Sequence, residues 1–90
     1  MKTHKRIPKI KKAEYTDGKI VVIFDNDETR YLIPDFFPND AHLQRIRQPH
    51  IWPYIAFDTH SIIWTKYILF DEPFEIGNNS VYLYSKPLDS

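Results

Sequence analysis

The amino-acid sequence predicts a small α+β domain built on antiparallel strands. Two runs rich in β-branched and aromatic residues flank the polar cluster at residues 25–28. Because Asp and Asn tolerate the left-handed backbone of tight turns, residues 19–33 are typical of a β-hairpin. Prolines at 34, 38 and 49 then bracket a short helical segment, and further short apolar runs follow it. The expected order is an antiparallel β-meander of three strands, one short helix, and two or three further strands.

The meander begins with a strand expected over residues 7–15. Asp17 and Gly18 form one of the strongest short-range hairpin signals and predict a turn before the second strand, residues 20–24. That strand is apolar on both faces, which predicts a central strand covered on both sides. The third strand is expected over residues 29–33.

One helix is expected after the meander, over residues 40–48. Residues 39–40 offer an N-cap, Leu43 and Ile46 lie three apart on one buried face, and Pro49 ends the helix. At about two and a half turns, such a helix depends on packing against the sheet for its stability.

The C-terminal half predicts strands at residues 54–58 and 61–65, joined by a turn. Residues 67–70 continue or re-form a strand, and the acidic pair at residues 71–72 indicates another turn. Residues 80–84 fit either a final strand or a single helical turn.

Length and composition predict one domain over residues 7–90, preceded by a flexible basic arm at residues 1–6. The absence of Cys excludes disulfides, Cys-ligated zinc and thiol nucleophiles. No apolar run resembles a signal peptide or reaches the length of a membrane span, so the predicted location is cytoplasmic.

Basic residues are concentrated at the N-terminus. The first twelve residues hold six of the twelve Lys and Arg and no acid, and the other 78 residues hold six basic and twelve acidic side chains, a formal charge of −6. This asymmetry fits either a basic arm for nucleic acid or an acidic partner, or a solvated terminus that leads into an edge strand guarded by Lys.

The sequence lacks the parts of a catalytic or metal site. The four His residues have no metal-ligand spacing, and the acidic turn at residues 25–28 lacks the glycine and the ordered oxygens of a calcium loop. No Ser stands in a nucleophile elbow, and no Gly-rich phosphate loop is present. The prediction is a non-enzymatic protein with no catalytic residues, no cofactor and no metal.

Six segments follow one another in a characteristic order and spacing: residues 10–13, 19–24, 28–31, 46–52, 55–58 and 61–64. In this order the chain resembles, over about residues 9–84, a small bacterial family known as domain-of-unknown-function family 2442. The chain departs from the family's pattern in lacking Gly in the acidic turn at residues 25–28 and in carrying Thr65-Lys66-Tyr67 after Trp64.

The resemblance implies a compact α+β domain with no assigned catalytic activity. Some members of this family look like N-terminal domains fused to a helix-turn-helix. Others stand alone and look like parts of regulatory or toxin–antitoxin-type gene pairs, and this chain resembles the stand-alone kind.

The first functional hypothesis is a protein-interaction module that uses an exposed sheet edge or an aromatic patch formed by Trp52, Pro53 and Tyr54. Its partner would be a co-encoded protein or a second copy of the chain. The competing interpretation places Trp52, Tyr54, Phe57 and Trp64 in the core, because a domain this small depends on its aromatic residues for burial.

The alternative hypothesis is a nucleic-acid-binding accessory protein that uses the basic N-terminal strand against phosphates. A stacking platform for bases would require Tyr15, Tyr31 or Trp52 to face the same side as the lysines. Twelve acidic side chains elsewhere oppose this hypothesis. The basic residues in question are Lys5, Arg6, Lys9, Lys11 and Lys12, with Arg45 and Arg47 at the end of the expected helix.

Overall fold

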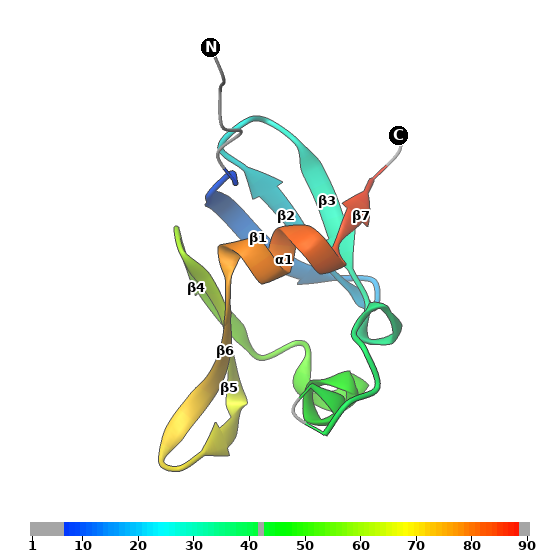
Figure 1. The fold of residues 1–90 in the computed structure, drawn as a ribbon, viewed down its shortest axis with the longest axis vertical. Helices are drawn as coiled ribbons and strands as arrows, with labels where there is room; N and C mark the ends of the chain where they lie inside the picture. Colours follow the sequence, from blue (N-terminus) through cyan, green and yellow to red (C-terminus); the bar gives the residue numbers. More distant parts are fainter. Residues whose placement is uncertain (1–6, 42, 89–90) are drawn as a thin grey trace.

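The computed structural model describes residues 7–41 and 43–88 and shows a small α+β domain, as predicted (Figure 1). Two antiparallel sheets, of four and three strands, pack with one helix around a shared core. The regular elements are β1 (Ile10–Thr16), β2 (Lys19–Phe24), β3 (Thr29–Leu32), β4 (Ile55–Asp58), β5 (Ser61–Leu69), β6 (Glu72–Gly77), α1 (Asn78–Tyr84) and β7 (Lys86–Pro87). Three short 3-10 turns lie between β3 and β4: η1 (Pro34–Phe36), η2 (Gln44–Arg47) and η3 (Pro49–Ile51).

The first sheet has the strand order β1-β2-β3-β7, so the predicted meander is confirmed. Asp17 and Gly18 both have positive φ, at 57° and 81°, as a two-residue hairpin turn with the right twist requires. Asp27 in the second turn has φ 69°, and the Asn26 side chain accepts a hydrogen bond from the backbone N–H of Glu28. The polar cluster therefore does make the predicted reversal.

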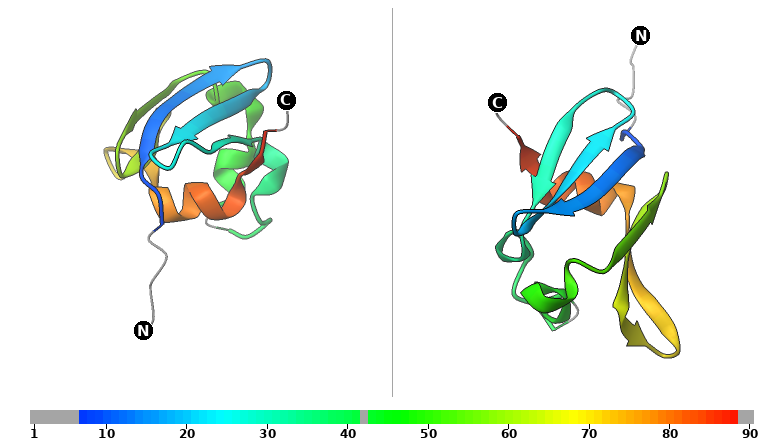
Figure 2. Two further views of the ribbon diagram at one scale, coloured as in Figure 1. Left: turned by 90° about the horizontal axis from the view of Figure 1, so that it is seen from above. Right: turned by 180° about the vertical axis from the view of Figure 1, so that it is seen from behind.

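β2 is central, but only one of its faces is covered. Ile20, Val22 and Phe24 are buried, whereas Val21 and Ile23 on the opposite face are only half-buried. The prediction of a strand covered on both sides is wrong, because α1 and the second sheet pack on the inner face alone (Figures 1 and 2).

The second sheet has the order β4-β5-β6 and is built from two hairpins. The predicted strand at residues 61–65 extends to Leu69, which confirms the expected continuation for residues 67–69, whereas Phe70 belongs to the following turn. Residues 80–84 belong to α1, so the helical alternative holds, and the short β7 after it pairs with β3.

The expected helix over residues 40–48 is replaced by a turn and the 3-10 segment η2. The Asp40 side chain does accept a hydrogen bond from the backbone N–H of Leu43, at 2.9 Å, as a cap would. The indole N–H of Trp52, however, donates to the backbone carbonyl of Ile46 at 2.6 Å. The carbonyls in the last turn of a helix have no intrahelical partner, so this bond satisfies one of them, and Pro49 disfavours helical geometry at Gln48. Leu43 and Ile46 are nevertheless both buried, as predicted.

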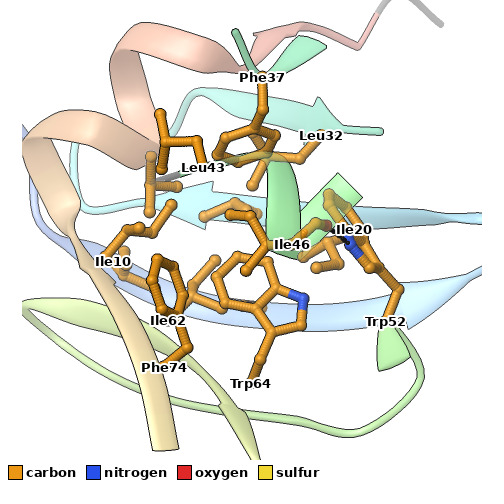
Figure 3. Packing of buried hydrophobic residues seen from close by; sticks show 14 of the residues in the cluster. Ile10, Ile20, Leu32, Phe37, Leu43, Ile46, Trp52, Ile62, Trp64 and Phe74 are labelled. Atoms are coloured by element: carbon orange, nitrogen blue, oxygen red, sulfur yellow. Dashed lines mark hydrogen bonds between the residues drawn. The ribbon is translucent and has the colours of Figure 1, made fainter. Parts of the chain in front are cut away.

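Aromatic rings form the centre of the core (Figure 3). Trp52 and Trp64 meet edge-on with ring centroids 5.4 Å apart, and Phe37 packs against both. The core prediction is confirmed for these two tryptophans. It is wrong for Tyr54 and Phe57, which lie at the margin of the second sheet and stay partly exposed.

A polar network joins α1 to the first sheet. The Arg30 guanidinium donates to the Ser85 hydroxyl at 2.8 Å and to the Ser85 carbonyl at 2.7 Å, and it stacks over the ring of Tyr82. The Tyr82 hydroxyl donates to the Glu28 carboxylate at 3.0 Å. These contacts hold the C-terminal segment against β3.

Replacing Tyr82 with phenylalanine should reduce the loss of stability at alkaline pH. The hydrogen bond to Glu28, with burial, raises the pKa of Tyr82 above its usual 10.0. A raised folded-state pKa gives stability that is fully present below the unfolded pKa and is lost as pH rises through the folded value. Denaturant melts at neutral pH and above pH 10 measure the effect, and Tyr31→Phe, on the outer face, should keep the wild-type decline. An equal alkaline decline in Tyr82→Phe would show that the bond carries no pH-linked stability.

Candidate functional site

The predicted aromatic patch does not form a continuous surface. Trp52 is 1% exposed and lies in the core, so its assignment to a partner-binding patch is corrected. Pro53 is exposed, and Tyr54 is 48% exposed with the Lys66 ammonium 4.8 Å from the centre of its ring. The exposed part of the predicted patch is therefore Pro53 and the Tyr54 ring, and Lys66 covers part of that ring.

Two of the three described lysines at the N-terminus have acidic neighbours. Lys5 and Arg6 lie outside the described residues. The ammonium of Lys11 lies 3.6 Å from the Asp27 carboxylate and that of Lys12 lies 3.4 Å from Glu14. Lys9 is exposed and precedes β1. Exposed pairs of this kind add little stability, but each places a negative charge where a phosphate would bind.

The aromatic residues proposed as a stacking platform lie on different sides of the molecule. A β-bulge between Ile10 and Lys12 breaks the period-two pattern, so Tyr15 packs on the inner face while Lys12 stands on the outer face. Tyr31 shares the outer face with Lys12, since β2 aligns both with outer positions. Of the three aromatic residues considered for stacking, Tyr31 alone lies on the face of Lys12, because Tyr15 packs on the inner face and Trp52 is buried.

The most unusual feature of the molecule is the far end of the β5–β6 hairpin, which projects from the body beside η2 (Figures 1 and 2). Between Trp64 and Ile68 the pairing of β5 with β6 is interrupted, and residues 65–67 have no partner in β6. Thr65 instead bonds the carbonyl of Tyr54 through both its N–H and its hydroxyl. A bulge of this kind bends a strand and redirects the side chains beyond it.

The turn of this hairpin holds a bulky residue in a strained conformation. Leu69 pairs with Glu72, which leaves Phe70 and Asp71 as a two-residue loop with φ values of 54° and 66°. Such turns favour Asn-Gly, because a positive φ costs an ordinary side chain roughly 1–2 kcal/mol. Phe70 therefore stands at a position where the fold alone would favour a different residue.

The side chains at this end are apolar and in contact with solvent. Phe70 is 87% exposed and Ile68 is 61% exposed. We use the name hairpin tip for residues 68–72, which hold these two side chains and the carboxylates of Asp71 and Glu72. Large apolar groups presented together on a projecting element mark interaction surfaces more often than isolated surface hydrophobics do.

A cleft of about 320 Å³ lies between the hairpin tip and the segment that leads into η2. Its lining is mostly apolar apart from one guanidinium: Ala41, Arg45, Leu69, Phe70 and Phe74. Arg45 donates to the Tyr67 hydroxyl at 3.0 Å, and the Tyr67 ring packs on Phe74 with centroids 6.0 Å apart. Tyr67 thus holds the guanidinium at the cleft.

The charges around the cleft form no ion pair with any other described residue. Among residues 7–41 and 43–88, no carboxylate lies within ion-pair distance of Arg45, and neither Asp71 nor Glu72 has a basic partner. By contrast, Arg47 in the same turn pairs with Asp35 at 3.5 Å. The hairpin tip and its cleft therefore present both signs of charge beside exposed apolar side chains.

Sequence reasoning does not single out Phe70. It predicts residues 67–70 only as a continuing strand and residues 71–72 only as a turn. The available signal is an apolar run that leads directly into a turn without Gly or Asn. The exposure of Phe70 depends on the bulge at residues 65–67, which a periodicity argument does not detect.

No protein-family model, curated protein or solved structure matches the chain. The resemblance to domain-of-unknown-function family 2442 stays a prediction. In the described part of the chain, no three His, Asp or Glu side chains are grouped as metal ligands, and no helix is long and apolar enough to cross a membrane.

Proposed function

We propose that this protein is a non-enzymatic interaction module that binds another protein through the hairpin tip. The observation that carries the proposal is Phe70, an aromatic side chain almost fully exposed on a left-handed backbone. Strain of this kind persists where the surrounding structure holds it, and it is concentrated at functional sites. Interface hot spots are usually aromatic side chains that become buried when the partner binds and that have polar groups beside them.

The position of the hairpin tip supports this function. The tip is the end of the second sheet that lies beyond the bulge of β5, and its Phe70 and Ile68 side chains are exposed there. Arg45 lines the cleft, and the exposed Asp71 and Glu72 follow Phe70 in the chain, so charges of both signs can contribute orientation and specificity. A role in a regulatory or toxin–antitoxin-type gene pair, in the cytoplasm of a bacterium, would agree with such a module and with the family resemblance.

The nucleic-acid alternative has weaker support. Lys11 and Lys12 already have acidic neighbours, and the acidic side chains of the tip would repel phosphates. Treatment with nuclease distinguishes binding to nucleic acid from binding to protein.

A photo-crosslinking amino acid placed at Phe70 should form protein adducts in lysate of the source cell. The probe is an aromatic ketone of similar shape, and the control position is Leu83, which is 71% exposed and belongs to α1. The helix α1 lies away from the far end of the β5–β6 hairpin (Figure 1). We expect defined adducts from position 70 that survive nuclease and few from position 83, because only the first lies in the proposed interface.

Equal labelling from both positions, or no protein adduct from position 70, would contradict the proposed function. Adducts that disappear with nuclease would instead favour the nucleic-acid alternative.

A further inference from the structure

We propose that the partner of the hairpin tip is a second copy of this chain. Two copies would pair about a twofold axis, with Phe70 of each against the cleft of the other and Asp71 of each facing the other's Arg45. This inference rests on the proposed function, since it names the partner of the same surface.

Charge complementarity within one chain is the first argument. The cleft holds a guanidinium that has no carboxylate partner in the described residues, and the adjacent turn holds two carboxylates that have no cation there. The fold holds Arg45 against Tyr67 and places Asp71 at the end of the hairpin. In an assembly of two copies, Arg45 and Asp71 each gain a partner of the opposite sign.

The apolar groups of the tip are complementary in the same way. The cleft is lined by Leu69, Phe70 and Phe74, and its volume of about 320 Å³ leaves room for an aromatic side chain from outside. The exposed ring of Phe70 is such a side chain, and it stands one residue from the carboxylate that would meet Arg45. Each tip thus has both the aromatic ring and the acid that the cleft can bind.

A twofold axis is the arrangement that closes these contacts within two copies. In an isologous interface residue i contacts residue j and j contacts i, so one surface must hold both members of every pair. The tip and cleft satisfy this condition, because one short hairpin and one turn supply the ring, the apolar lining and both signs of charge. The surface is small, and interfaces at the low end of the size range are weak and dependent on concentration.

Sedimentation velocity on the purified full chain tests the inference. Over about 1–500 µM, where weak interfaces associate, the wild type should show a reversible monomer–dimer equilibrium. Arg45→Glu and Asp71→Arg should each weaken self-association by about tenfold or more, because like charges would then face each other twice in the dimer. Lys66→Glu, on the same hairpin but over Tyr54, carries the same charge change as Arg45→Glu and should associate like the wild type.

An equimolar mixture of Arg45→Glu and Asp71→Arg gives the decisive result. Neither variant pairs well with itself. In the mixed dimer, however, the two introduced side chains have opposite charges and face each other, and the unchanged Asp71 of one copy faces the unchanged Arg45 of the other. The mixture should therefore associate like the wild type, and the double variant should recover self-association for the same reason. Circular dichroism confirms that each variant is folded.

A wild type that stays monomeric at the highest concentration would overturn the inference, as would a mixture that associates no better than its components. If position 70 still forms adducts with a different protein in lysate, the proposed function holds and only the identity of the partner is wrong. If it forms none, both fail together.

Discussion

Trp52→Ala should remove about 3–5 kcal/mol of the free energy of unfolding, the largest effect expected from a single change in this protein. A domain of 90 residues has about 5–13 kcal/mol in total, so the variant would be partly unfolded at body temperature. The cause is the loss of a fully buried ring that packs on Trp64 and Phe37. Urea denaturation followed by circular dichroism measures it.

A matched pair of milder variants separates packing from hydrogen bonding. Trp52→Phe and Trp64→Phe make the same chemical change at two buried tryptophans. The indole N–H of Trp52 donates to the Ile46 carbonyl at 2.6 Å, whereas the indole N–H of Trp64 has no partner among the described residues. The Trp52 change leaves a buried carbonyl unsatisfied and should cost about 1–3 kcal/mol more than the Trp64 change.

Equal losses from the two phenylalanine variants would show that the bond to Ile46 contributes nothing. If Trp52→Phe keeps its stability but loses partner binding, Trp52 contributes to an interface. The structure favours a structural role, because this bond fixes the turn in which Arg45 stands.

The prediction of the strands succeeded where local chemistry decides the conformation. Asp17-Gly18 has the backbone that its turn type requires, and the polar cluster at residues 25–28 does reverse the chain. Each of these signals is contained in about four residues, so a single sequence reveals it.

Predictions failed where a distant contact decides the result. The segment at residues 40–48 adopts a turn and 3-10 geometry in place of the expected helix, and Trp52, from outside the segment, donates to its Ile46 carbonyl. Whether Val21 and Ile23 are buried depends on which face of the first sheet the second sheet packs against. Both outcomes rest on tertiary packing, which overrides local propensity.

The candidate site was missed for a related reason. Aromatic residues in a small domain are expected in the core, and this expectation holds for Trp52 and Trp64. Phe70 is exposed because a bulge and a tight turn carry it beyond the core. Neither its exposure nor its positive φ is visible in the residue types alone.

Phe70→Asn should change stability and binding in opposite directions. Asn accepts the left-handed backbone at this turn position, so the variant should gain about 0.5–1 kcal/mol, or a few degrees in Tm. Little packing is lost, because Phe70 is mostly exposed. Self-association should weaken by about tenfold or more, since the aromatic anchor is gone. Melting at micromolar concentration, where the monomer dominates, keeps the two effects separate.

Asp17→Asn provides the matched control. Asp17 occupies the first loop position of the β1–β2 turn, as Phe70 does in the β5–β6 turn, and it has a similar φ of 57°. The change creates Asn-Gly, which should stabilise the monomer slightly while leaving association at the wild-type level. A loss of stability in Phe70→Asn would assign Phe70 to the fold, and unchanged association would remove it from the interface. A more stable monomer that no longer pairs would show that the strain at Phe70 is retained for binding.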